Sequence, residues 1–176
     1  QLLVDRAQVV TTISNNSKQD IEKHLDVRKP VHVIYNGVSL SKPYNDLSLQ
    51  LKRPFLLIMA RICPDKNQSS LIDVMPYLDK YDLIIAGKPS VEYLSKLKIQ
   101  AKNLKVDNRI WFIHDVSQSM KSWLLKTCSA LLFPSKAEGF GLPVIEAMRH
   151  GKPVFLSNLP VLHEVAGNLA FYFRSF

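Results

Sequence analysis

Residues 55–87 read FLLIMARICPDKNQSSLIDVMPYLDKYDLIIAG, and this stretch decides the fold. Two apolar runs, FLLIMA at 55–60 and DLIIAG at 82–87, enclose a polar segment in which apolar residues recur every three or four positions. Short continuous apolar runs are typical of strands buried on both faces, and the three- and four-residue period is typical of an amphipathic helix. The stretch therefore predicts a strand–helix–strand unit with a right-handed crossover.

Apolar runs of similar length recur along the rest of the chain. They predict further strands at 110–113 (IWFI), 130–134 (ALLFP), 153–157 (PVFLS) and 169–173 (LAFYF). Segments with the helical period stand at 67–80, 90–104, 117–128 and 142–150. This alternation predicts an α/β fold built on a doubly wound parallel sheet.

Residues at the ends of the expected helices indicate their boundaries. Asp65 and Ser117 each stand before a helical segment and can act as N-caps. Pro143 suits the first turn of a helix, and Gly151 suits the position after its last turn.

The first 52 residues have a different pattern of apolar and polar residues from the rest of the chain. Strand-like and helix-like segments within 1–36 suggest the end of one α/β domain, because they form only one or two strand–helix units. Residues 37–52 are polar and irregular, which is typical of a linker. Residues 53–176 then form a second α/β domain. Gln1 in place of a methionine suggests a piece of a longer protein.

Composition narrows the classes of partner. The 23 Lys and Arg against 15 Asp and Glu give a net charge of +8, which favours phosphate-bearing partners or weak contact with an anionic membrane surface. The lysines are dispersed rather than grouped with aromatic residues, so we expect no nucleic-acid binding. Cys63 and Cys128 lack metal-ligand spacing and indicate free thiols in a reducing compartment, the cytoplasm. No apolar run approaches the length of a membrane-spanning helix.

Ligands of open parallel sheets bind outside the carboxyl ends of the strands. This rule selects the loops that follow Ala60, Ala86, Ile113 and Pro134. The last of these loops begins the sequence SKAEGFGLPVIEAMRHGKP at 135–153. Its expected helix begins near Leu142, where free amides and the helix dipole favour an anion. Gly139 and Gly141 allow close approach of a ligand, so the loop is a candidate diphosphate cradle.

Two carboxylates flank this candidate cradle. Glu138 precedes it on the loop, and Glu146 lies about one turn into the helix. A carboxylate can accept two hydrogen bonds from a vicinal diol, and a nucleotide sugar carries diols on both sides of a diphosphate. Spacing alone equally allows Glu138 to be a solvated loop residue and Glu146 to lie on an exposed helix face.

Two cations follow the first strand of the second domain. Arg61 leaves its carboxyl end and Lys66 opens the next helix, so both can face the same crevice. Arg binds a diphosphate through bidentate contacts, and Lys acts as a point charge. The alternative is an ordinary surface pair near a helix start.

Three motifs carry a resemblance to a known family. PSKAEGFGLPVIEAMRHGKPV (134–154), ARICPDKN (60–67) and IYNGV (34–38) resemble the retaining nucleotide-sugar glycosyltransferases of glycosyltransferase family 4. The motifs stand in the family's order, and the resemblance covers essentially the whole chain. It implies the GT-B architecture, two Rossmann-like domains that face each other across a cleft, with 53–176 as the C-terminal, nucleotide-sugar-binding domain.

The resemblance implies a role for each matching position. Glu138 would contact hydroxyls of the transferred sugar, and Glu146 would hold the ribose hydroxyls. Arg61 and Lys66 would bind the diphosphate and stabilise it as it departs. Further donor-binding candidates are the backbone of the cradle and two residues in neighbouring loops: Gly139, Phe140, Gly141, Leu142, Gly87 and His114.

The activity implied by the resemblance is transfer of a hexose with retention of configuration. It needs neither a metal nor a separate cofactor, and the chain has no aspartate-x-aspartate metal motif. The donor would be GDP- or UDP-linked. LPVLHEVAGNLAFYF (159–173) resembles mannosyltransferases and favours mannose from GDP-mannose. Ala60 and His114 replace common family glycines, which leaves the base open.

The acceptor expected from the resemblance is a polysaccharide or a lipid-linked glycan. It would bind through the acceptor-side domain, most of which lies outside this sequence, so we expect the chain alone to bind donor without transferring sugar. Two alternatives remain open, another GT-B enzyme such as a nucleotide-sugar epimerase, and a non-catalytic nucleotide-sugar-binding module. A phosphorylase would need a pyridoxal-binding lysine motif, which is not evident in the sequence.

Overall fold

The computed structural model describes residues 2–39 and 51–174. Residues 2–39, here called the N-terminal unit, contain a two-stranded parallel sheet of β1 (Val10–Thr12) and β2 (Val31–Val33). Two helices accompany this sheet, α1 (Leu2–Arg6) and α2 (Asn15–His24). The helix α1 was not among the elements expected from the sequence. Most of the expected linker, residues 40–50, lies outside the described residues.

All six strands expected after residue 53 form one parallel sheet. Its order is β5-β4-β3-β6-β7-β8. The strands are β3 (Phe55–Met59), β4 (Asp82–Ala86), β5 (Ile110–Ile113), β6 (Ala130–Phe133), β7 (Val154–Leu156) and β8 (Phe171–Tyr172). The chain builds outward from β3 to β5, returns to β6 beside β3, and then builds outward in the other direction. The predicted doubly wound, Rossmann-like sheet is confirmed, and its switch point lies between β3 and β6.

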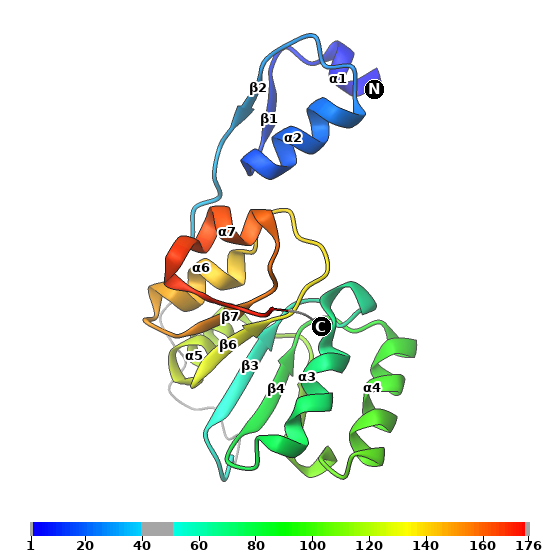
Figure 1. The fold of residues 1–176 in the computed structure, drawn as a ribbon, viewed down its shortest axis with the longest axis vertical. Helices are drawn as coiled ribbons and strands as arrows, with labels where there is room; N and C mark the ends of the chain where they lie inside the picture. Colours follow the sequence, from blue (N-terminus) through cyan, green and yellow to red (C-terminus); the bar gives the residue numbers. More distant parts are fainter. Residues whose placement is uncertain (1, 40–50, 175–176) are drawn as a thin grey trace.

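Helices cover both faces of this sheet. They are α3 (Gln68–Val74), α4 (Val91–Asn103), α5 (Gln118–Thr127), α6 (Leu142–Arg149) and α7 (Pro160–Ala166). The outward-building half places α3 and α4 on one face, where Leu71 and Leu97 belong to a single buried cluster. The return and the second half place α5, α6 and α7 on the other face. Figure 1 shows these layers.

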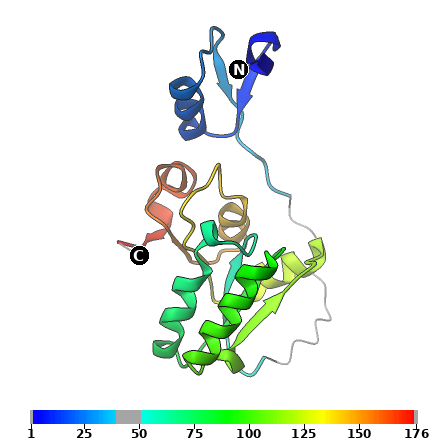
Figure 2. The same cartoon turned by 90° about the vertical axis from the view of Figure 1, so that its right-hand side faces the viewer.

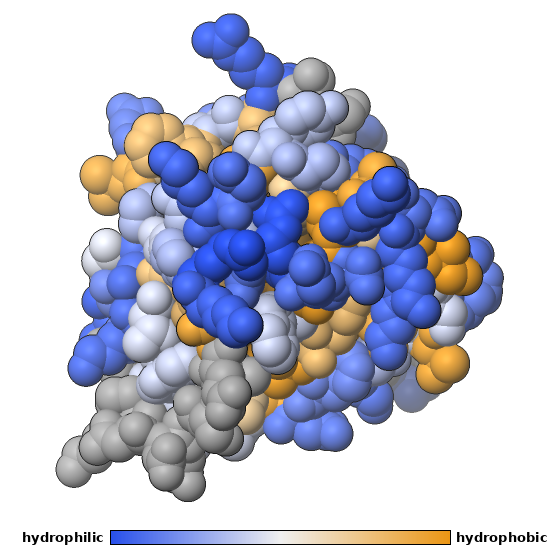
Figure 3. Space-filling model, turned by 90° about the horizontal axis from the view of Figure 1, so that it is seen from below, coloured by the Kyte–Doolittle hydropathy of each residue, from blue (hydrophilic) through white to orange (hydrophobic). Residues whose placement is uncertain are grey.

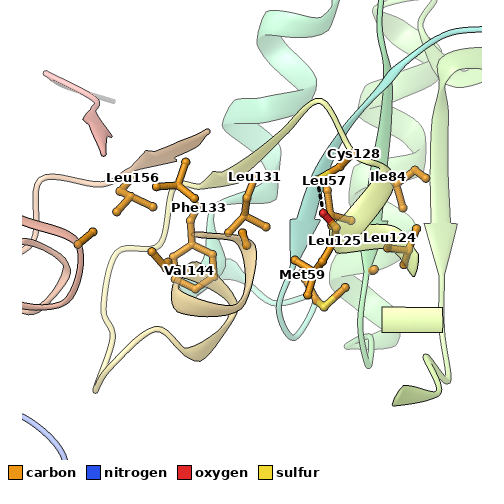
Figure 4. Packing of buried hydrophobic residues seen from close by; sticks show 14 of the residues in the cluster. Leu57, Met59, Ile84, Leu124, Leu125, Cys128, Leu131, Phe133, Val144 and Leu156 are labelled. Atoms are coloured by element: carbon orange, nitrogen blue, oxygen red, sulfur yellow. Dashed lines mark hydrogen bonds between the residues drawn. The ribbon is translucent and has the colours of Figure 1, made fainter. Parts of the chain in front are cut away.

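A single hydrophobic cluster fills the space between the sheet and the helices α5, α6 and α7. Figure 4 shows Phe133 of β6 beside Val144 of α6, and both residues are almost completely buried. The central strands β3 and β4 are buried at every position. Continuous apolar runs were therefore the correct signal for burial on both faces at β3 and β4, but not at the edge strand β8, where Phe171 is 60% exposed. The surface on the side away from the N-terminal unit is mainly hydrophilic, with small hydrophobic patches (Figure 3).

Three of the four boundary residues act as the sequence predicts. The Ser117 hydroxyl accepts a hydrogen bond from the Met120 amide at 3.2 Å and caps α5. Pro143 lies in the first turn of α6, and Gly151 follows its end with a φ of +67°. The prediction for Asp65 was wrong, for reasons that lie in the turn around it.

The segment expected as one helix at 67–80 is divided at Pro76, and a separate turn precedes it. Pro64 begins a 3₁₀ turn (Pro64–Lys66) that ends at Asn67 in the left-handed region, with a φ of 51°, so Asp65 lies inside this turn rather than at a helix cap. The helix α3 ends early because Pro76 has no amide for the Ile72 carbonyl, which accepts from Met75 instead. A second 3₁₀ turn (Met75–Tyr77) follows.

The N-terminal unit rests on the helices of the second half of the sheet. In Figures 1 and 2 it lies above α6 and α7, and α2 contacts α7. The rings of Tyr35 and Phe140 have centroids 6.0 Å apart. The Ser14 hydroxyl donates a 3.0 Å hydrogen bond to the Gly139 carbonyl. The unit therefore contacts the loop between β6 and α6, which carries the candidate cradle.

Candidate functional site at the carboxyl ends of the central strands

Backbone hydrogen bonds join the four loops selected from the sequence. The Lys136 amide donates to the Asp65 carbonyl at 2.8 Å, which links the loop after β6 to the loop after β3. The Ile62 amide donates to the Lys88 carbonyl at 2.9 Å, which links the loops after β3 and β4. The Gly87 amide donates to the Ile113 carbonyl at 2.9 Å and reaches the end of β5. The four loops form one contiguous surface, as the fold rule predicts.

Glu138 and Lys66 form the central contact of this surface. The Lys66 ammonium lies 2.7 Å from Glu138 Oε1 and 3.0 Å from the Ala137 carbonyl oxygen. Their side chains are only 14% and 11% exposed, Lys66 first. Partial burial strengthens a charge pair relative to one in water. Glu138 is therefore a fixed, ion-paired carboxylate and not a freely solvated loop residue.

The loop that carries Glu138 is shaped by its own backbone. The Ser157 hydroxyl donates a 2.6 Å hydrogen bond to the Ser135 carbonyl and anchors the start of the loop. Gly141 stands at the N-cap of α6 with a φ of +93°, and a Cβ there would lie 2.9 Å from Leu162 Cδ2. Only glycine fits both the conformation and the space. The expected helix start at Leu142 is confirmed, and no side chain caps it.

The other cradle residues differ in their exposure. Phe140 is 5% exposed and packs toward Tyr35 of the N-terminal unit, so its side chain stabilises the loop. Gly139 and Leu142 are exposed. A ligand can reach the backbone at these two positions without displacing a side chain from the core.

Glu146 lies in a buried environment and not on an exposed helix face. The residue is 9% exposed, and its Oε1 accepts a 2.5 Å hydrogen bond from the Lys121 ammonium. Among the described residues, its buried Oε2 has no hydrogen-bond partner. The carboxylate lines a small cavity of about 20 Å³ between α5 and α6, together with Ser39, Gln118, Lys121, Ser122, Leu125 and His150.

Gly87 and His114 lie together where β4 and β5 end. The His114 Nδ1 atom is 3.4 Å from the Gly87 carbonyl oxygen. Gly87 has a φ of +146°, and a Cβ there would lie 2.0 Å from the Ala60 carbonyl oxygen. Gly87 is therefore required for the close approach of the loops after β3 and β4, whatever else it contacts.

Arg61 is exposed at the rim of this surface. Its side chain makes no hydrogen bond or ion pair within the described ranges, whereas its carbonyl accepts a 2.7 Å hydrogen bond from Gln68 Nε2. The guanidinium is thus free to reorient toward a ligand. The structure pairs Lys66 with Glu138 directly, whereas the Arg61 side chain has no partner among residues 2–39 and 51–174.

Lys121 is the residue that the sequence reasoning missed. It stands in the first turn of α5, on the loop side of the sheet, and pairs with Glu146 across 25 positions of sequence. A lysine near the start of the helix that follows the loop after β5 was an available signal. Its partner could not be identified without the packing of α5 against α6.

His150 also lines the cavity beside Glu146. Burial lowers the pKa of His150 below 6.5, with further lowering by Lys126, Lys152 and Arg149, while Glu146 opposes the shift. The imidazole is therefore neutral near pH 7. In the part of the chain that the structure describes, no group of three or more His, Cys, Asp or Glu side chains is arranged to hold a metal ion.

The fold is a Rossmann-like domain of the kind that forms the C-terminal half of GT-B glycosyltransferases. The chain belongs to the family of glycosyl transferases group 1, whose family model matches residues 44–171. The resemblance noted in the sequence is therefore confirmed.

Two curated relatives are mannosyltransferases by name. The chain is 34% identical to the O-antigen chain mannosyltransferase RfbU of Salmonella typhimurium over 175 residues, 98% of this chain and 48% of that protein. It is 32% identical to the serotype-specific mannosyltransferase WbdA of Escherichia coli over 131 residues, 72% of this chain and 16% of that protein. The chain thus spans at most about half the length of either relative.

A solved structure shares the architecture closely. The chain superimposes with a TM-score of 0.83 on HepE of Anabaena, solved in complex with UDP and glucose, at 25% identity. The match covers 95% of this chain and 49% of HepE. Across residues 2–39 and 51–174, no helix is both long and apolar enough to cross a membrane.

Proposed function

We propose that this chain is the donor-binding part of a retaining glycosyltransferase. It takes a hexose, with mannose from GDP-mannose favoured, from a nucleotide sugar and passes it to a polysaccharide or lipid-linked glycan. The observation that carries this proposal is the Lys66–Glu138 pair, held 2.7 Å apart at the switch point of a group 1 glycosyl transferase domain. A cation for a diphosphate and a carboxylate for sugar hydroxyls stand side by side there.

The proposed donor lies across the joined loops. Its diphosphate would lie between the start of α6, Arg61 and Lys66, where free amides and two cations complement its charge. Its sugar would lie against Glu138, and its ribose near Glu146. His114 and Gly87 would border the base, because they end the neighbouring strands β5 and β4.

The proposed reaction breaks the bond between the sugar's anomeric carbon and the diphosphate oxygen. The acceptor hydroxyl attacks the same face, and its proton passes to the departing phosphate oxygen. Arg61 and Lys66 stabilise the charge that develops on the diphosphate, so the step needs neither a metal nor a covalent sugar–enzyme intermediate. The acceptor would be held by the acceptor-side domain, with weak attraction of the cationic chain to an anionic membrane surface.

The similar proteins point to two different donors. RfbU and WbdA are named as mannosyltransferases, which agrees with the mannose expectation. HepE was solved with UDP and glucose, which favours the other base and sugar. The overall sequence identity is higher to RfbU, and for this reason we keep GDP-mannose as the first candidate.

Calorimetric titration of the full-length protein with GDP-mannose, UDP-glucose and ADP-glucose tests the proposal. A ligand at about 100 times its dissociation constant raises the free energy of unfolding by about 2.7 kcal/mol, so thermal unfolding gives a second readout. We expect GDP-mannose to bind most tightly. Binding of a nucleotide sugar without any transfer to glycan would instead favour a non-catalytic module, and interconversion of two nucleotide sugars would favour an epimerase.

A further inference from the structure

The carboxylate of Glu146 is buried, charged and only half paired. Its Oε1 accepts from the Lys121 ammonium at 2.5 Å, whereas its Oε2 is buried and has no hydrogen-bond partner among the described residues. A buried carboxylate oxygen without a donor is costly, so its persistence calls for an explanation. Glu146 also lines a cavity of about 20 Å³, which has room for one hydroxyl-sized group.

Lys121 determines which oxygen of the carboxylate remains available. The lysine side chain is 26% exposed and the glutamate side chain 11% exposed, so the pair lies at the edge of the core. Because Lys121 belongs to α5 and Glu146 to α6, the ion pair also fixes the carboxylate relative to both helices. Without the ammonium, the carboxylate would lose the one ion pair that it forms in the described part of the chain.

We propose that Lys121 is a positioning residue for the ribose of the donor. By occupying Oε1 of Glu146, it holds Oε2 in the orientation that accepts a hydrogen bond from a ribose hydroxyl. This inference rests on the proposed function, in which Glu146 binds the ribose. The proposed function gives Lys121 no role, whereas here Lys121, which lies outside the stretch 134–154 that holds both glutamates, orients the Glu146 carboxylate.

The test compares nucleotides with and without the ribose diol. Dissociation constants of GDP and UDP, and of their 2′,3′-dideoxy analogues, are measured by calorimetry for the full-length wild-type protein and for Lys121→Met. Wild type is expected to prefer the ribonucleotide by about tenfold or more, because its hydroxyls donate to a charged acceptor. In Lys121→Met this preference should fall to about twofold or less, while affinity for the dideoxy analogue stays unchanged.

Three further variants isolate the effect. Lys121→Arg keeps a cation beside Oε1 and should retain most of the preference. Lys96→Met, which removes the lysine of an exposed ion pair on α4, is the control and should behave as wild type. Lys121→Gln is too short to reach Oε1, and it replaces Lys121→Met in the test if that variant does not fold.

The outcomes separate this inference from the proposed function. Failure of every nucleotide to bind wild type would refute the proposed function itself. A ribose preference that survives in Lys121→Met, or tighter ribonucleotide binding in that variant, would overturn the inference alone. Equal weakening for ribo- and dideoxynucleotides would also overturn it, because Lys121 would then contact another part of the ligand.

Discussion

The Lys66 ammonium lies 2.7 Å from Oε1 of Glu138 and thereby joins the loop after β3 to the loop after β6. These loops follow the two strands that meet at the switch point of the sheet. The lysine also holds the Ala137 carbonyl, so one side chain fixes both the backbone and the carboxylate of the second loop. The pair holds two loops together, and its charges also suit a sugar diphosphate. Substitutions can separate the effect on stability from the effect on ligand binding.

Glu138→Gln in the full-length enzyme should reduce kcat by about 10²-fold or more, a loss comparable to that of one preorganised charge at a reacting centre. The amide keeps an oxygen for Lys66, so nucleotide affinity should change by less than about threefold. Steady-state transfer assays and calorimetry with the nucleoside diphosphate measure the two effects. Glu92→Gln is the matched control, since Glu92 forms an exposed ion pair with Lys96 at 2.6 Å. Near-normal turnover in Glu138→Gln would refute the assignment.

Lys66→Met should weaken both binding and turnover. It removes a cation from the proposed diphosphate site and leaves Glu138 without its ion-pair partner, so kcat/KM should fall by about 10²–10³-fold. In contrast to Glu138→Gln, the dissociation constant of the nucleoside diphosphate should rise by about tenfold or more. Lys96→Met, from the exposed pair on α4, should alter neither quantity. Unchanged diphosphate affinity in Lys66→Met would place the diphosphate elsewhere.

The strands, and the loops that carry the candidate site, were predictable from short stretches of sequence and the order of the strands. The continuous apolar character of 55–59 and 82–86 is sufficient to indicate strands buried on both faces, and the loop rule follows from the sheet topology. The division of the expected helix at 67–80 was missed because its overall apolar period masked the effect of Pro76. Proline should have outweighed the period there.

The partners of the site residues were less predictable because they depend on packing between distant segments. Lys121 resembles any solvated lysine on a helix until α5 is placed beside α6. Glu164 contacts Asn15 across 149 positions of sequence, and no local pattern indicates that contact. Burial of Glu146 likewise follows from its position between two helices and not from its sequence spacing to Glu138.

Gly87→Ala should disrupt the loops that form the site. The new Cβ would lie 2.0 Å from the Ala60 carbonyl oxygen, and the φ of +146° is unfavourable for any side chain. We expect the free energy of unfolding to fall by about 2 kcal/mol or more, measured by chemical denaturation. Gly151→Ala is the control, because Gly151 has a φ of +67° with open space around it and should lose only about 1 kcal/mol. Equal losses in the two variants would show that the close approach to Ala60 does not matter.

Glu164 of α7 attaches the N-terminal unit to the larger domain. Its carboxylate accepts hydrogen bonds from the Asn15 amide at 2.7 Å, the Asn16 amide at 3.0 Å and the Tyr35 hydroxyl at 2.9 Å. A carboxylate at the first turn of α2 satisfies free amides and complements the helix dipole. This contact lies beside Phe140 and the candidate cradle, so it also influences the loop of Glu138.

Glu164→Ala should destabilise the contact by about 1 kcal/mol, a value typical for loss of a helix N-cap. The direct measurement is hydrogen exchange at the Asn15 and Asn16 amides, which should exchange faster in the variant. Glu22→Ala removes an exposed carboxylate from α2, whose ion pair with Lys18 spans 3.8 Å, and should leave those amides protected. Unchanged exchange in Glu164→Ala would mean that the Ser14 cap alone secures the start of α2.

Acid should weaken the same contact. Burial alone would raise the pKa of Glu164, but hydrogen bonds from the Asn15 and Asn16 amides and from the Tyr35 hydroxyl together lower it below 4.5. An unfolded chain therefore binds a proton at this carboxylate at a higher pH than the folded chain does, and stability falls as the pH drops. The contribution is complete above about pH 4.5 and is lost as the pH falls through the lower folded pKa. Unfolding free energies measured from about pH 6 to about pH 3 should converge for wild type and Glu164→Gln at the acid end, and a constant difference over that range would contradict this role.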